Sequence, residues 1–136
     1  MIKAIVFAAL FTTAVGTQAV AQSAESGIQK VISDQITAFL ADDFATAFTF
    51  ASPNIKRMFG TPDNFGRMVR QGYPMVHRPS EVEFAGLAER NGRMVQTVIL
   101  TDGSGTLHFL DYEMVETDAG WQINGVWLRR PPSLGA

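Results

Sequence analysis

The sequence has no cysteine, only two histidines and two tyrosines in 136 residues, and 18% charged side chains. Without cysteine, disulfides, thiol catalysis, lipid attachment at a thiol and the commonest structural zinc sites are excluded. Two histidines are too few for a transition-metal site, so neither a metal nor a cofactor is expected. The net charge of −2 comes with no basic stripe, which argues against nucleic acid as a partner. A chain of this length forms one domain around a single core.

The first 21 residues predict a secretory signal peptide. Met1–Lys3 provide a positive start, Ala4–Val15 provide an apolar stretch too short to span a membrane, and Ala19-Val20-Ala21 has small side chains where a signal peptidase requires them. We therefore expect cleavage after Ala21 and an exported domain of residues 22–136, in the periplasm or outside the cell. The alternative is an uncleaved helix.

Residues 27–71 predict four helices. Ser26 and Gln29 form a capping box for the first, because their side chains can satisfy free amides at a helix start. Its apolar residues recur at three- and four-residue steps and share one face: Ile28, Val31, Ile32, Ile36, Phe39 and Leu40. Asp42 and Asp43 are expected to cap a second, short helix.

Two further helices begin with the same device, a hydroxyl N-cap followed by proline, at Ser52-Pro53 and Thr61-Pro62. Gly60 and Gly72 suit the positions just beyond the ends of these helices. His77-Arg78, just before Pro79, is expected to lie in a solvated loop. The helical segments are rich in phenylalanine, which predicts a core in which a few rings line a cavity: Phe39, Phe44, Phe48, Phe50, Phe59 and Phe65.

After Tyr73-Pro74 the apolar period changes to two residues, and strands are expected at about 81–88, 93–101, 106–116 and 121–129. Turn sequences rich in glycine separate them, which predicts an antiparallel meander. The end of the chain, Arg129-Arg130-Pro131-Pro132, should leave the sheet as a tail. Helices followed by strands indicate an α+β fold in which the helices pack on one face of a curved four-stranded sheet.

Alternation along the last two strands assigns residues to faces. Leu110, Tyr112 and Met114 share one face with His108, opposite Leu107, Phe109, Asp111 and Glu113. In the last strand, Trp121, Ile123, Gly125 and Trp127 are expected on one face. Because neither face is cleanly polar, the side without helices is expected to bind a second copy of the chain, in a homodimer, or a ligand.

Five segments carry a resemblance to a known family: Phe48–Ile55, Met58–Gly60, Phe65–Val69, Gly72-Tyr73 and Trp121–Val126. With them the chain resembles a family of small exported bacterial domains of unknown function within the nuclear-transport-factor-2-like, or cystatin-like, superfamily. The resemblance implies a cone in which a curved sheet wraps around helices and encloses an apolar cavity. It implies no particular activity and provides no catalytic motif.

The residues that could carry acid/base chemistry are His108, Tyr112, Asp111 and Tyr73. A buried carboxylate or histidine beside a phenol can move a proton and stabilise an oxyanion. His108 and Tyr112 share a strand face but lie about 13 Å apart along it, and Asp111 faces the other way. They do not form one connected site in this arrangement.

Three functions therefore remain open. The first is an exported, non-catalytic domain that binds a small apolar ligand or a protein partner. The second is a cofactor-free enzyme of isomerase or dehydratase type that uses these residues. The third is a structural dimerisation module, which would have an interface but no cavity.

Overall fold

The fold is known from a computed structural model, which describes residues 16–130, with side chains from Ser23 onward. Five helices come first: α1 (Gly16–Leu40), α2 (Phe44–Thr49), α3 (Pro53–Phe59), α4 (Pro62–Gly72) and α5 (Pro74–His77). Four strands follow: β1 (Glu81–Arg90), β2 (Arg93–Thr101), β3 (Leu107–Thr117) and β4 (Gly120–Arg129). The strands form one antiparallel sheet in the order β1-β2-β3-β4. The predicted α+β meander is confirmed.

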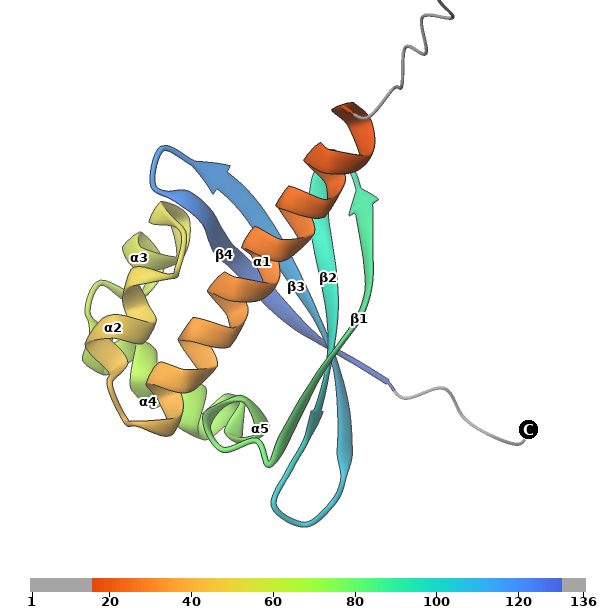
Figure 1. Cartoon of the computed structure of the whole chain (residues 1–136). Helices are drawn as coiled ribbons and strands as arrows, with labels where there is room; N and C mark the ends of the chain where they lie inside the picture. Colours follow the sequence, from red (N-terminus) through yellow and green to blue (C-terminus); the bar gives the residue numbers. More distant parts are fainter. Residues whose placement is uncertain (1–15, 131–136) are drawn as a thin grey trace, which may run out of the picture.

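The helices form a layer on one side of a strongly twisted sheet, and α1 runs across the strands (Figure 1). Ile28, Ile32, Ile36 and Phe39 recur along one stripe of α1 and are at most 3% exposed, so this stripe is the helical half of the core. The sheet contributes fully buried side chains from its central strands, among them Val98, Leu100, Leu110, Tyr112 and Met114. The other side of the sheet, here called the open face, is covered by no described element.

The predicted N-caps of the short helices are confirmed. The Asp43 carboxylate accepts the backbone N–H of Thr46 at 3.1 Å, and the Thr61 hydroxyl accepts that of Asn64 at 3.2 Å. Ser52 caps α3 by accepting the Ile55 N–H and donates its own proton to Asn124 of β4 at 2.7 Å. Gly60 ends α3 with a φ of 78°, which glycine adopts without steric cost. Gly72, in contrast, is the last residue of α4, and Tyr73 follows as its cap.

The predicted start of the first helix is wrong. α1 begins at Gly16, and Ser26 lies inside it, because nothing between these two residues breaks a helix. The Gln29 amide donates to Glu25 and Gln96 instead of to the helix start. α1 thus begins within the predicted signal segment, whose first parts, Met1–Lys3 and Ala4–Val15, lie outside the described residues. Cleavage after Ala21 stays a prediction.

Asp42 and His77 also differ from expectation. Asp42 caps no helix; it adopts a φ of 53° and its carboxylate binds the His77 ring at 2.8 Å and the Arg78 guanidinium at 2.9 Å. His77 belongs to α5, a short helix that the sequence did not predict, and its ring packs on Phe44. The hydrogen bond from His77 is the main reason why the pKa of the Asp42 carboxyl lies below its ordinary value.

The expected face assignment of β4 is wrong because of a β-bulge. Asn124 is the extra residue: Ile123 pairs with Met114, but Gly125 pairs with Glu113. Residues opposite each other in a sheet share a face, so Ile123 faces the helices while Gly125 and Trp127 lie on the open face. Pro131 and Pro132 of the predicted tail lie outside the described residues, and β4 ends at Arg129.

Candidate functional site

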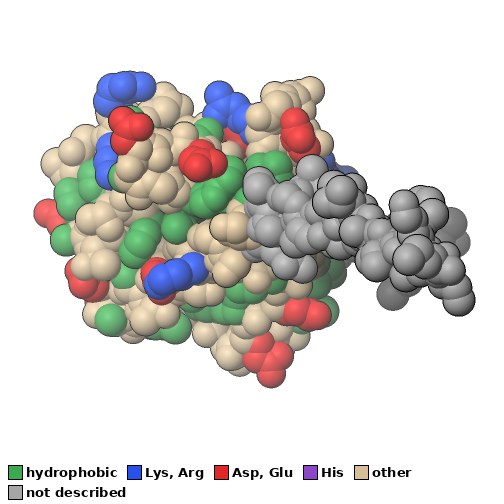
Figure 2. Space-filling view, turned by 45° about the horizontal axis from the view of Figure 1, so that its top comes forward, with side chains coloured by type: hydrophobic (Ala, Val, Ile, Leu, Met, Phe, Trp, Pro, Cys, Tyr) green, Lys and Arg blue, Asp and Glu red, His purple; other side chains and the backbone are tan. Residues whose placement is uncertain are grey.

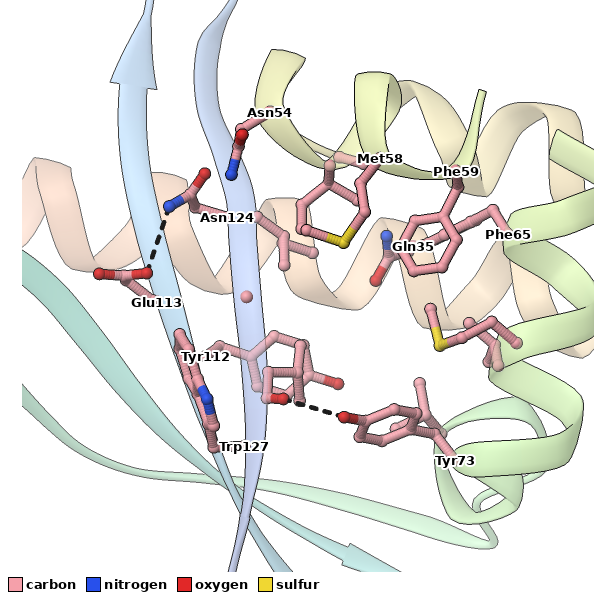
Figure 3. A pocket seen from close by; sticks show the side chains of 18 of the residues that line it. Gln35, Asn54, Met58, Phe59, Phe65, Tyr73, Tyr112, Glu113, Asn124 and Trp127 are labelled. Carbon is pink, nitrogen blue, oxygen red and sulfur yellow. Dashed lines mark hydrogen bonds between the residues drawn. The ribbon is translucent and has the colours of Figure 1, made fainter. Parts of the chain in front are cut away.

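A pocket of about 500 Å³ lies between the helix layer and β4. Helices α1, α3, α4 and α5 supply one wall, with mainly apolar side chains: Phe39, Ile55, Met58, Phe59, Phe65, Met68, Val69 and Val76. Strands β3 and β4 supply the opposite wall, with Tyr112, Ile123 and Val126 on the helix side of the sheet, and Glu113, Gly125 and Trp127 border the pocket from the open face. Figure 3 shows the labelled helix residues on the side of the strands toward which Tyr112 points, with Glu113 and Trp127 on the other side of the strands. The predicted aromatic lining is confirmed for Phe39, Phe59 and Phe65.

Tyr112, one of the residues that line this pocket, has a buried hydroxyl without a hydrogen-bond partner. Tyr112 is 0% exposed, and within the described part of the chain its hydroxyl oxygen has no hydrogen-bond partner. An unsatisfied buried hydroxyl costs about 1–3 kcal/mol. Burial, with a smaller contribution from Tyr73, raises the pKa of the Tyr112 phenol well above its ordinary value. Tyr112 is therefore a neutral donor at the wall of an apolar cavity.

The helical segments contribute three further polar side chains to the pocket lining. The Tyr73 hydroxyl, at the junction of α4 and α5, donates to the Val126 carbonyl at 3.2 Å (Figure 3). The amide of Gln35 is buried among the apolar residues of α1 and donates to the Ala47 carbonyl at 3.1 Å. Asn54, near the start of α3, is exposed. Tyr73 and Gln35 each have a partner within the protein, whereas Tyr112 has none.

The rim of the pocket is held by a chain of hydrogen bonds around the β4 bulge. Asn124 accepts from Ser52 and donates to the Glu113 carboxylate at 3.2 Å (Figure 3). The backbone supports the same place, because Ser52 N–H donates to the Ile123 carbonyl and Ile123 N–H donates to the Phe50 carbonyl, both at 2.8 Å. These bonds fasten the chain entering α3 to the edge of the sheet and fix one side of the pocket.

The pocket lining carries almost no charge. Among the residues that form it, Glu113 is the one ionisable acid and there is no lysine, arginine or histidine. On the side of the molecule drawn in Figure 2, charged side chains are scattered singly among apolar and uncharged ones. A ligand in this pocket would therefore find a phenol and amides as partners, but no cation.

The structure places the four candidate residues in three locations. Tyr73 and Tyr112 meet in the pocket. His108 lies at the start of β3, where its Nε2 contacts Asp102 of the preceding turn at 2.8 Å. This bond, followed by one from Ser104, lowers the pKa of the Asp102 carboxyl. His108 and Asp102 thus close a turn and do not line the pocket.

Asp111 lies on the open face of the sheet, as its position in the strand predicts. Its carboxylate accepts from the Thr97 hydroxyl at 2.9 Å and from Arg129 Nε at 2.7 Å, and Arg90 approaches to 3.3 Å. Burial alone would raise the pKa of this carboxyl, but the bonds and charges of these three neighbours outweigh it and the pKa is lowered. Asp111 is therefore an ionised anchor for two arginines, separated from the pocket by the sheet.

Gln35 and Asn124 were not singled out by the sequence reasoning. The sequence spacing does predict that Gln35 is buried, because it lies three residues after Ile32 and four after Val31, on the apolar stripe of α1. A polar residue on a buried stripe must find a hydrogen bond, so its position marks a polar point inside the domain. Asn124 has no such signal, since its role depends on the bulge.

The fold and the pocket together define a class: a small α+β domain with an apolar cavity between a helix layer and an antiparallel meander. Residues 21–136 match the family described as "Domain of unknown function (DUF4864)", and the chain belongs to this family. No curated protein matches the sequence, and no solved structure matches it. Among the described residues, no helix is long and apolar enough to cross a membrane. The same residues contain no group of three or more acidic or histidine side chains that could hold a metal ion.

Proposed function

We propose that this domain binds a small, neutral and largely apolar molecule that carries a hydrogen-bond acceptor such as a carbonyl group, and that it does so without catalysis. The observation that carries the proposal is that Tyr112 lines a pocket of about 500 Å³ and that its hydroxyl is buried without a hydrogen-bond partner. This volume lies within the range of pockets that hold small ligands. A ligand acceptor would give the hydroxyl the partner that the protein does not supply.

The electrostatics of the lining favour a neutral ligand. A carboxylate or phosphate in this cavity would lose its hydration without gaining a cation, which is costly in an apolar surrounding. A carbonyl loses less hydration and gains a hydrogen bond from Tyr112, whose raised pKa keeps its proton in place. The pocket therefore favours ligands that match its shape, make apolar contacts and accept one hydrogen bond.

Two further observations support this function. The resemblance to the nuclear-transport-factor-2-like superfamily implies a cone with an apolar cavity, and the pocket between helices and sheet fits such a cone. The signal peptide predicted at residues 1–21 fits a binding protein that works outside the cytoplasm.

Export is tested by the mass of the recovered protein. When the full chain is expressed in a bacterium with a Sec pathway, we expect the periplasmic fraction to contain a chain that begins at Gln22, because cleavage follows Ala21. Ala19→Arg should block processing, since the peptidase requires a small side chain there. Recovery of the uncleaved chain in the cytoplasm would contradict the export proposal.

Ligand binding is tested with prodan, a neutral fluorescent naphthalene that carries a ketone. We expect the wild-type domain to shift prodan emission to the blue on binding. Tyr112→Phe should weaken this binding by about tenfold, the equivalent of one hydrogen bond of ~1.4 kcal/mol. The same substitution should leave the free energy of unfolding unchanged or slightly higher, because the hydroxyl it removes has no partner in the protein.

Two controls make this result specific. Tyr73→Phe removes a hydroxyl that already has a partner, so it should lower the free energy of unfolding by about 1 kcal/mol with little effect on prodan. The parent 2-(dimethylamino)naphthalene lacks the ketone and should bind wild type and Tyr112→Phe equally. Absence of prodan binding to the folded domain, or equal affinity of wild type and Tyr112→Phe, would overturn the proposal.

The pocket also supports a second candidate, an acid/base enzyme of isomerase or dehydratase type, because Tyr112 could donate to a developing oxyanion. Its base would have to be Glu113, the one carboxylate among the lining residues, although its side chain lies on the opposite face of β3 from Tyr112 and is bonded to Asn124 at the rim. Turnover of a ketone substrate that Glu113→Gln abolishes would establish this candidate in place of the non-catalytic one.

A further inference from the structure

One row of paired residues crosses the open face of the sheet with an acid at one end and a base at the other. Glu83 of β1 pairs with Ile99 of β2, Ile99 pairs with Phe109 of β3, and Phe109 pairs with Arg129 of β4. We propose that this face joins two copies of the chain in a two-fold symmetric dimer, in which Glu83 of each copy binds Arg129 of the other.

The row is self-complementary when it is reversed. In a face-to-face dimer whose axis runs parallel to the strands, β1 of one copy lies over β4 of the second, and β2 lies over β3. Glu83 then meets Arg129, and Ile99 meets Phe109. Since adjacent strands are about 4.8 Å apart, the two charged ends of the row are separated by about 14 Å, and both ion pairs can form at once.

The charged ends of this row are available. Within residues 16–130, Glu83 has no ion-pair partner, and its side chain is exposed. Arg129 uses its Nε–H for Asp111, which leaves the outer N–H groups of the guanidinium for a second carboxylate. Its side chain is 42% exposed. The contact with Asp111 also fixes the guanidinium in place, so a second copy would meet an ordered group.

The middle of this row is apolar, and further apolar side chains lie beside it on the open face. Ile99 and Phe109 are half-buried, and Leu107 and Trp127 are 52% and 54% exposed. No helix covers this side of the sheet, as Figure 1 shows for the described residues. Apolar side chains in the centre with opposite charges at the two ends give both the driving force and the orientation for a symmetric contact.

The neighbouring row fits the same arrangement. It contains Thr97, Asp111 and Trp127, and reversal places the indole of Trp127 over the part of β1 near Ala85 and Gly86. The pairing of β1 shifts at these two residues, and a Cβ at Gly86 would meet no atom within 4 Å. The second copy therefore offers a stretch of strand without large side chains where the indole needs space.

The size of the face sets the expected strength of the dimer. Four strands of about ten residues span roughly 19 Å by 33 Å, or about 600 Å². This area is somewhat below the ~800 Å² per partner of a standard interface. Dissociation should therefore occur in the micromolar range, and the measurement has to cover about 1–300 µM.

The test is analytical ultracentrifugation of the folded domain with charge-reversed variants. We expect the wild type to change from monomer to dimer over this concentration range. Glu83→Arg should raise the dissociation constant at least tenfold, because it places two positive groups together at each end. The double variant Glu83→Arg with Arg129→Glu should restore the dimer, since reversal of both charges regenerates both pairs.

A second pair of variants decides the question if Arg129→Glu disturbs Asp111 and the domain does not fold. Ile99→Lys places a charge in the apolar middle of the row and should abolish the dimer. Val82→Lys is its matched control, because Val82 pairs with Leu100 on the helix side and is 39% exposed; this variant should dimerise as the wild type does. A monomeric wild type at 300 µM, or equal effects of the two lysine variants, would overturn the proposal.

Discussion

Phe39→Ala is expected to lower the free energy of unfolding by about 3–5 kcal/mol, because it removes a large ring from the centre of the helical core. Phe39 is 1% exposed, and its ring centroid lies 5.9 Å from that of Phe65 and 6.1 Å from that of Phe44. Removal of the ring leaves a cavity that the neighbouring rings can fill only in part. Small domains have about 5–15 kcal/mol of stability in total, so this single change removes a large fraction of it.

Urea denaturation followed by circular dichroism measures this loss. Leu40→Ala is the matched control: Leu40 is the next residue on α1 and is 47% exposed, so its truncation should cost less than about 1 kcal/mol. Phe39 also lines the pocket, and the variant that still folds should bind prodan in an enlarged, less selective cavity. A loss below about 1 kcal/mol for Phe39→Ala would show that this region is not the packed core described here.

Asp111→Asn should lower the free energy of unfolding by about 2 kcal/mol, the second-largest effect expected. The substitution keeps the shape of the side chain but removes the charge that holds Arg129 and Arg90 on the open face. Breaking a buried ion pair costs about 3–5 kcal/mol, and the value is smaller here because both guanidiniums are about half exposed. Asp118→Asn, in the exposed turn before β4, is the control and should change little.

The same carboxylate predicts a pH dependence. Its pKa is lower in the folded protein than the ordinary value of about 3.9, so the folded state favours the ionised form. The stability it contributes is present above pH ~4 and is lost as the pH falls below that value. The stability difference between wild type and Asp111→Asn should therefore shrink in acid. A difference that stays constant from pH 7 to pH 3 would contradict this role.

Local chemistry explains why the sequence predicted most elements. Proline after a hydroxyl residue favours a helix start, because its fixed φ suits the first helical position, and Asn91-Gly92 forms a turn in which both residues have positive φ, at 52° and 78°. The four strands were therefore located to within one or two residues. The start of α1 was missed because a capping box also occurs inside a helix, where tertiary packing decides whether the chain turns away.

The site was only partly predictable for a different reason. Tyr73 and Tyr112 were predicted as phenols that could take part in acid/base chemistry. They lie 39 positions apart in the sequence, and only the packing of α4 and α5 on the sheet brings both into one pocket. The bulge at Asn124 reversed the expected faces of β4 because one extra residue changes the parity of all that follow. Whether the Tyr112 hydroxyl has a hydrogen-bond partner depends on the positions of all the atoms around it. A sequence pattern does not contain these positions.

The attachment of the chain before α3 to β4 has a consequence for solubility. Edge strands expose unpaired amide and carbonyl groups and can recruit other chains into fibrils. Phe50–Ser52 occupy these groups at Ile123 in the middle of β4, and the bulge there bends the strand away from flat pairing. The opposite edge, β1, carries Glu81, Glu83 and Glu89, whose like charges repel a second β1. Both edge strands of the sheet are therefore protected against pairing with strands of other chains.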